Sequence, residues 1–176
     1  FVKAISEVTS IPGKKAVIFG AGGAARAIAV EMALAGVGEI IIVNVSERGK
    51  SLSDLLNSRT PAKASFLPWN RPFSIPSDAD IVINATPVGL YPNVEQRLNI
   101  RVDTLLPQMI VADCIPNPVY THLLKDALAN GCKHVLPGMN MLVYQAMIAI
   151  KYWTGKDVDA DIMKQELMRV LGLSKQ

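Results

Sequence analysis

The sequence is poor in the features that mark several protein classes. Its only cysteines, Cys114 and Cys132, form no C-x-x-C motif and have no histidine at ligand spacing, so they predict ordinary thiols without a disulfide or metal site. No apolar run approaches the roughly 20 residues that span a bilayer. The N-terminus lacks the charged segment and cleavage site of a signal peptide. These absences predict a cytoplasmic protein with no membrane partner.

The charge balance also excludes a class of partner. The net charge is only +3, and the basic residues are scattered through the chain with no dense run and no interleaved aromatics, so no nucleic-acid partner is expected. Half of the 176 residues are apolar and 19% are charged, which supplies one domain with an ample core. Because the chain begins at Phe1 and not at Met, we expect a fragment or a processed product.

Short β-rich runs alternate with helical stretches, which predicts βαβ units and an α/β fold with a Rossmann-like, doubly wound parallel sheet of about six strands. The expected strands are Ala16–Phe19, Glu39–Val43, Ala64–Leu67, Ile81–Asn84, Ile110–Asp113 and His134–Leu136. The expected helices are Gly23–Ala35, Arg48–Leu56 and Val119–Asn130, with two C-terminal helices at Met141–Trp153 and Ala160–Leu171. The proline-rich Pro68–Asp78 and the stretch Pro87–Arg97 are expected to be loops.

A glycine turn joins the first expected strand to the first long helix. Gly20 and Gly22, with the small Ala25, fit the G-x-G-x-x-[GA] spacing of dinucleotide-binding turns. Gly20 permits the tight turn, Gly22 lets the backbone approach a pyrophosphate, and Ala25 lets the helix pack closely on the strand. N–H groups at the helix start would face the anion. The spacing predicts a dinucleotide site, with a chance glycine turn as the alternative.

The residues after the second strand bear on the choice of cofactor. That strand ends at Asn44, about 20 residues past the glycine turn, where an NAD-specific site commonly carries Asp or Glu. Ser46 can donate a hydrogen bond there, and Arg48, with Lys50 nearby, has the planar fork that suits phosphate. Glu47 favours the opposite interpretation, since it can accept from the ribose 2′-hydroxyl of NAD. The segment therefore favours NADP and leaves NAD, or a solvated first helical turn, as alternatives.

Four segments together resemble the C-terminal, cofactor-binding domain of the shikimate/quinate dehydrogenase family, in the family's order. The glycine turn Gly20–Ala27 alone is unspecific. Asn84–Leu90 matches the family's Asn-Ala-Thr-[Pro/Ser]-x-Gly-Met loop, and Asp113–Thr121 matches Asp-x-x-Tyr-x-Pro-x-x-Thr. Gly138–Ala146 matches Gly-x-Gly-Met-Leu-x-x-Gln-[Ala/Gly]. The resemblance spans nearly the whole chain.

The resemblance implies where cofactor and substrate bind. The backbone amides after the strand that ends at Asn84, together with Thr86, suit a nicotinamide ribose. Alternatively, the side chains of Asn84 and Thr86 cap a turn. The family uses the glutamine that matches Gln145 to hydrogen-bond a substrate hydroxyl. The expected cofactor-binding residues are Gly20, Ala21, Gly22, Gly23, Ala24, Asn44, Val45, Ser46, Arg48, Asn84, Ala85, Thr86, Pro87, Val88, Cys114, Gly138 and Met141.

Three residues depart from the family pattern. Val45 replaces the arginine that usually follows the second strand in NADP-dependent members, which leaves Arg48 as a substitute clamp. Pro116 stands where the family has a tyrosine near substrate and nicotinamide, and it supplies no hydroxyl. Asn140 replaces a glycine of the last motif, where its side chain is able to crowd the nicotinamide.

The resemblance also places the family's catalytic lysine and aspartate in an N-terminal domain, and no such domain precedes Phe1. His122 and His134 are expected to be surface or structural residues and do not replace them. We therefore expect residues 1–176 to form one dinucleotide-binding domain with no metal and no catalytic residue of its own. It would bind NADP without turnover and would meet its small-molecule substrate through the missing domain. A second copy of the chain, in a homodimer, is the other partner considered.

The leading function is part of a shikimate dehydrogenase-like oxidoreductase of aromatic amino acid biosynthesis, which reduces 3-dehydroshikimate or a quinate analogue with NADPH. The alternative is a non-catalytic nucleotide-sensing or interaction module, which the departures at Pro116 and Asn140 favour. A third option is a methylene-tetrahydrofolate or glutamyl-transfer-RNA reductase type. That type shares the glycine turn but lacks the last two motifs.

Overall fold

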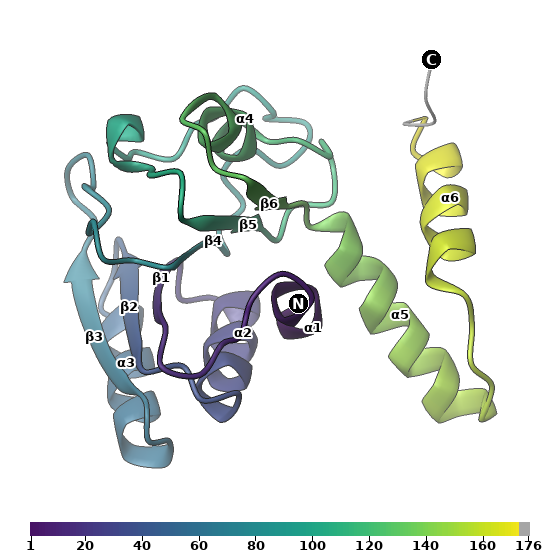
Figure 1. The fold of residues 1–176 in the computed structure, drawn as a ribbon, viewed down its shortest axis with the longest axis horizontal. Coiled ribbons are helices and arrows are strands. Elements are labelled where there is room, and N and C mark those ends of the chain that lie inside the picture. Colours follow the sequence, from purple (N-terminus) through teal and green to yellow (C-terminus); the bar gives the residue numbers. More distant parts are fainter. Residues whose placement is uncertain (173–176) are drawn as a thin grey trace.

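The structure, a computed structural model, describes residues 1–172 and contains a six-stranded sheet in the order β3-β2-β1-β4-β5-β6 (Figure 1). Every neighbouring pair of strands is parallel. The strands are β1 (Lys15–Phe19), β2 (Glu39–Asn44), β3 (Lys63–Pro68), β4 (Ile81–Asn84), β5 (Ile110–Asp113) and β6 (His134–Leu136). The order in which the chain adds strands to the sheet reverses between β1 and β4, which confirms the predicted Rossmann-like fold.

The helices agree with the sequence pattern to within a few residues. They are α1 (Val2–Ser6), α2 (Gly23–Leu34), α3 (Arg48–Arg59), α4 (His122–Ala129), α5 (Met139–Thr154) and α6 (Ala160–Val170), with a 3-10 turn η1 (Val102–Thr104). Helix α4 begins three residues later than predicted because Thr121 is its N-cap residue. None of the helices within residues 1–172 is both long and apolar enough to cross a membrane.

One face of the sheet packs against helices. Alternate strand residues such as Ile18, Ile42 and Ile83 are fully buried there, in one cluster with Met32 of α2 and Leu56 of α3. Because side chains of a strand alternate between faces, an apolar run without polar interruptions predicts burial on both faces. This face is the scaffold that sets α2 and α3 beside each other.

The other face of the sheet is covered by one helix and by loops. Val17, Phe19, Val82 and Val111 pack there against α4 alone among the long helices, and loops fill the remainder. The β3–β4 crossover is a loop, as its prolines predict. Two aromatic residues of this loop cover the sheet where a helix would otherwise pack. The ring centroids of Trp69 and Phe73 lie 5.0 and 5.6 Å from that of Phe19.

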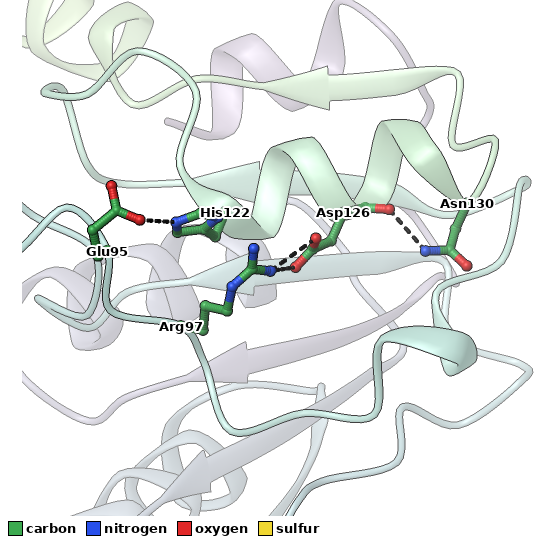
Figure 2. A network of polar contacts seen from close by, with 5 residues as sticks. All are labelled: Glu95, Arg97, His122, Asp126 and Asn130. Atoms are coloured by element: carbon green, nitrogen blue, oxygen red, sulfur yellow. Dashed lines mark hydrogen bonds and ion pairs between the residues drawn. The ribbon is translucent and has the colours of Figure 1, made fainter.

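The long loop after β4 is fastened to α4 by exposed polar contacts (Figure 2). His122 Nε2 lies 3.1 Å from an oxygen of Glu95. The Arg97 guanidinium donates to both carboxylate oxygens of Asp126, at 3.0 and 2.8 Å. Exposed ion pairs contribute only about 0–1 kcal/mol each, so their role is to position the loop rather than to hold the fold.

Helices α5 and α6 form an antiparallel pair that stands beside the sheet (Figure 1). Gly155, with φ +70°, ends α5 in the left-handed conformation that favours glycine. Asp159 caps α6, because its carboxylate accepts from the N–H groups of Asp161 and Ile162 at 2.8 and 3.0 Å. Asp157, two residues before this cap, pairs with Lys151 at 2.7 Å.

The packing of α2 on the sheet generates a stability prediction. Met32→Ala removes a fully buried side chain and is expected to lower the free energy of unfolding by about 2–5 kcal/mol. Leu34→Ala, two residues away on the same helix but 68% exposed, is the matched control and is expected to change it by under about 0.5 kcal/mol. Urea unfolding of the 176-residue chain measures both, and equal effects would contradict the assigned core.

Candidate functional site

The parallel strands bring the predicted motifs to the carboxyl edge of the sheet. Backbone hydrogen bonds join these strand ends: Gly20 N–H donates to Val43 O at 2.8 Å, Ala85 N–H to Phe19 O at 2.9 Å, and Cys114 N–H to Asn84 O at 3.0 Å. The glycine turn and the loop after β4 flank the point where the strand order reverses. Ligands of open α/β sheets bind in the crevice at this point.

Gly20 has no side chain because the protein itself leaves no room for one. Its φ of +106° is a conformation that L side chains rarely adopt. A Cβ there would also lie 2.8 Å from the carbonyl oxygen of Ala85 and 3.1 Å from Cγ2 of Thr86. The turn after β1 therefore lies directly against the loop after β4, and this contact fixes the geometry of the edge.

Gly22 and Gly23 lack side chains for a different reason. A Cβ at either position would meet no atom of the described chain within 4 Å. Gly22 also has an ordinary extended backbone, with φ −81° and ψ −169°. Neither packing nor strain within the described residues requires glycine here, and the bare backbone leaves open space for a group that approaches from outside. A pyrophosphate against the start of α2 fits this observation.

The start of α2 presents unneutralised positive potential. Its N-cap residue Gly22 offers no side-chain cap, and its first turn contains no acidic residue. The N–H groups of the first helical turn have no partner within the helix, and the helix dipole adds to their attraction for an anion. Among residues 1–172, no group of three or more His, Cys, Asp or Glu gathers as metal ligands do. The start of α2 is thus suited to a phosphate.

A small cavity of about 180 Å³ adjoins the glycine turn. It is lined by Ala21, by Arg26 of α2 and by residues of the first turns of α3, namely Arg48, Ser51 and Leu52. Glu47, the residue that favoured NAD, is the exposed N-cap of α3 and does not line it. The walls carry two guanidinium groups and no carboxylate.

The other polar residues after β2 have partners of their own. The Asn44 side-chain amide donates to the carbonyl and hydroxyl oxygens of Ser46, at 2.9 and 3.0 Å. The Ser46 hydroxyl therefore accepts and keeps its own proton to donate. Lys50 pairs with Asp54 at 2.9 Å, one turn further along α3. Val45 is 78% exposed at the strand tip. Arg48 is the residue of this predicted segment that faces the cavity.

A buried carboxylate joins the loops after β4 and β5. Asp113, fully buried at the end of β5, accepts from the Thr121 hydroxyl at 2.7 Å, from Ile115 N–H at 2.9 Å, and from the Asn84 amide at 3.2 and 3.1 Å. Burial raises the pKa of Asp113 to about 6, although the hydrogen bonds from Ile115, Thr121 and Asn84 lower it.

Asn84, which donates to Asp113, also holds the loop after β4 by hydrogen bonds. Its side-chain oxygen accepts from the N–H and the hydroxyl of Thr86 at 3.0 and 2.7 Å, and Thr86 Oγ1 accepts from Val88 N–H at 3.2 Å. Asn84 is fully buried, whereas Ala85, Thr86 and Val88 are half-buried and Pro87 is exposed. Its side chain therefore shapes the loop, and a role for this loop in binding a cofactor stays a prediction.

The β6–α5 segment closes the same edge of the sheet. A Cβ at Gly138 would lie 2.4 Å from the carbonyl carbon of Cys114 and 2.6 Å from that of Ile115, so only glycine allows this approach. Cys114 is half-buried, and burial raises the pKa of its thiol to about 12. A protonated thiol is a poor nucleophile, so Cys114 serves here as a small packing residue.

Met141 and Gln145 lie further from the glycine turn, on α5. With Tyr144 they line a cavity of about 510 Å³ between α1, α2 and α5, which Ala24 of the first turn of α2 also lines. The Tyr144 hydroxyl donates to Glu7 at 2.9 Å and so holds α5 near the N-terminal segment. Gln145 is exposed, with its amide available to a ligand.

The other two departures from the family pattern, besides Val45, lie in α5 and in the loop after β5. Asn140 lines a separate cavity of about 190 Å³, between α5, α6 and Glu7, instead of the one that Gln145 lines. Pro116 is half-buried in the loop after β5.

Arg26 is the residue that sequence reasoning missed as part of the site. A cation in the first turns of a helix is electrostatically unfavourable, and that was the available signal.

Comparison with known proteins agrees with this geometry. Residues 138–168 match the family profile described as the Shikimate 5'-dehydrogenase C-terminal domain. The chain is 39% identical over 173 residues to the shikimate dehydrogenase (NADP(+)) of Desulforamulus reducens, covering 95% of this chain and 59% of that relative. The chain thus spans about 60% of the length of the curated relatives that it matches.

Two solved structures are similar over nearly the whole chain. The ligand-free 5-ketofructose reductase of Gluconobacter sp. strain CHM43 is 43% identical with a TM-score of 0.92, over 97% of this chain and 61% of that one. Shikimate 5-dehydrogenase from Listeria monocytogenes, in complex with shikimate and NAD, is 34% identical with a TM-score of 0.83. It matches over 94% of this chain and 60% of its own.

The two glycines of the turn are expected to respond differently to substitution. Gly20→Ala should lower the free energy of unfolding by about 1–3 kcal/mol, because of its positive φ and its contact with Ala85. Gly22→Val should lower it by under about 1 kcal/mol and abolish dinucleotide binding, since the new side chain fills the space of the pyrophosphate. Thermal unfolding and calorimetry measure these effects. Unchanged affinity in Gly22→Val would make the turn purely structural.

Asp113 predicts a pH dependence of stability. Its pKa of about 6 in the folded chain lies above the unfolded value of 3.8, so the folded state binds the proton more tightly. The contribution of Asp113 to stability is fully present below pH 3.8 and is lost as the pH rises through 6. At about 1.4 kcal/mol per unit of pKa, the parent should gain roughly 2 kcal/mol relative to Asp113→Asn between pH 7.5 and pH 4.

Urea unfolding of both chains across this pH range tests the prediction. Asp103→Asn is the matched control, because exposed Asp103 pairs with Arg101, which lowers the pKa of that carboxyl. The control should show no such gain on acidification. A stability difference between parent and Asp113→Asn that stays constant with pH would contradict the assigned burial of the charge.

Proposed function

Because the chain belongs to the shikimate dehydrogenase family and corresponds to its C-terminal domain, we propose that it is the NADP-binding domain of an NADPH-dependent reductase. The observation that carries the proposal is the bare backbone of Gly22 beside a cavity that Arg48 lines and no carboxylate enters. The first suits a pyrophosphate, and the second suits a ribose that carries a 2′-phosphate.

The chain's own residues would bind and orient the cofactor. The first-turn N–H groups of α2 hold the pyrophosphate, Arg48 with Ser46 holds the adenosine ribose, and the loop stabilised by Asn84 and Asp113 lies along the nicotinamide ribose. Bound NADPH supplies a hydride to a carbonyl carbon, while a proton must reach the carbonyl oxygen. Binding the cofactor on preformed loops reduces the entropy lost when reactants are brought together.

The substrate class is a ketone next to a hydroxylated carbon, with 3-dehydroshikimate as the first candidate. Relatives named shikimate dehydrogenase (NADP(+)) support this choice. Gln145 would donate to or accept from a substrate hydroxyl at the mouth of the cavity between α1, α2 and α5. The family's catalytic lysine and aspartate belong to an N-terminal domain, so residues 1–176 alone should bind NADP without turnover.

A second candidate substrate is a keto sugar such as 5-ketofructose. The 43% identity and TM-score of 0.92 to the Gluconobacter 5-ketofructose reductase favour it. The proline at position 116, where shikimate dehydrogenases carry a tyrosine, also favours a different substrate. NADPH oxidation by this domain joined to a substrate domain decides between them: faster turnover of 5-ketofructose than of 3-dehydroshikimate would select the keto sugar.

The choice of NADP over NAD depends on Arg48. Charge-assisted hydrogen bonds contribute about 1.5–3 kcal/mol, and each 1.4 kcal/mol is about tenfold in affinity. Arg48→Ala should therefore weaken NADP binding about 10- to 100-fold and leave NAD, which lacks the phosphate, nearly unchanged. Lys50→Ala is the matched control, because Lys50 pairs with Asp54 and lies outside the cavity. Calorimetry on the three chains measures both ligands.

Other outcomes would overturn the proposal in distinct ways. If Arg48→Ala leaves the ratio of the NADP and NAD affinities unchanged, Arg48 is only a solvated helix residue. A parent chain that prefers NAD would assign the ribose to Glu47. A parent chain that binds neither dinucleotide would favour the non-catalytic interaction module.

A further inference from the structure

Arg26 lies where its charge has no evident use within the chain. It is the fourth residue of α2, and Arg48 is the first residue of α3, so both cations lie near the positive ends of helix dipoles. A cation there is electrostatically unfavourable. The first turn of α2 carries no acidic residue, and at the start of α3 the exposed N-cap Glu47 does not line the cavity that adjoins the glycine turn. Helix α2 thus carries an electrostatic cost at this edge of the sheet.

The two arginines face one space. They line the cavity of about 180 Å³ together with Ala21 of the glycine turn. Within residues 1–172, neither guanidinium forms an ion pair or a side-chain hydrogen bond, so the donors of both are free for a ligand. Like charges that line one cavity repel each other, so the cavity favours an anion from outside the chain.

We propose that Arg26 is a specificity-determining residue that, with Arg48, clamps the 2′-phosphate of NADP. The inference rests on the proposed function and adds a residue from outside the β2–α3 segment. Arg26 compensates for Val45, whose side chain at the tip of β2 is 78% exposed and has no donor. Two planar guanidinium forks offer a phosphate monoester more donors than one arginine does.

The position of the cavity favours the 2′-phosphate over the pyrophosphate. Ala21, Ser51 and Leu52 place it between the glycine turn and α3, beyond the end of β2. The bare backbone of Gly22 and Gly23, at the start of α2, already provides for the pyrophosphate. The two phosphate groups of one dinucleotide would thus occupy neighbouring but separate parts of the edge.

The test compares ligands that differ in one phosphate. Calorimetry on the 176-residue chain measures NADP, NAD, adenosine 2′,5′-bisphosphate and ADP against the parent, Arg26→Ala, Arg26→Lys and Arg26→Ala/Arg48→Ala. Arg59→Ala, at the far end of α3 and outside the cavity, is the control for the loss of one exposed positive charge. Circular dichroism on each variant checks that the exposed substitution leaves the fold intact.

Arg26→Ala should weaken binding of NADP and of adenosine 2′,5′-bisphosphate about 10-fold, and binding of NAD and ADP less than about twofold. Arg26→Lys should recover part of the loss, because it keeps the charge without the fork. The double variant should bind NADP and NAD equally, and Arg59→Ala should match the parent.

The failures are distinguishable. Equal losses for ADP and adenosine 2′,5′-bisphosphate would assign Arg26 to the pyrophosphate and overturn the inference. A parent that prefers NADP, with Arg26→Ala unchanged, would also overturn it but leave the proposed function standing. A parent that binds neither dinucleotide would overturn both.

Discussion

The common direction of the six strands is the constraint on which the rest of this structure depends. Parallel strands place every strand end at one edge of the sheet, and each following helix begins at that edge. The N-terminal ends of α2 and α3, with their orphan N–H groups and their arginines, therefore lie beside each other. The apolar interior carries no chemistry of its own, so the polar groups that end the strands decide what the chain can bind.

Asp113 shows how such an edge is kept rigid. Removing a carboxylate from water is costly, and the raised pKa of Asp113 reflects that cost. Its oxygens are satisfied by donors from β4, from the loop after β5 and from the N-cap of α4, so one buried group fixes three segments. Asn84 carries this order into the loop that faces the glycine turn. Two loops held in this way keep one shape before a ligand arrives, which lowers the entropic cost of binding.

Sequence reasoning succeeded where the signal is local. Ile81–Asn84 and Ile110–Asp113 each consist of three apolar residues followed by one polar residue, and the structure has those strands with the predicted bounds. The glycine turn was also visible, because Gly20 and Gly22 are neighbours in the chain. Partners far apart in sequence were not visible. Asp113 and Asn84 are 29 residues apart, and only the pairing of β4 with β5 brings them together. Arg26 and Arg48 likewise line one cavity only because α2 and α3 pack on the same face of the sheet.

The most direct test of the account is a crystal structure of the chain with NADP bound. The account predicts the pyrophosphate against the N–H groups at the start of α2, with the 2′-phosphate within hydrogen-bond distance, about 2.7–3.2 Å, of both the Arg26 and the Arg48 guanidinium groups. A dinucleotide bound at this edge with its 2′-phosphate in solvent, away from both arginines, would contradict it.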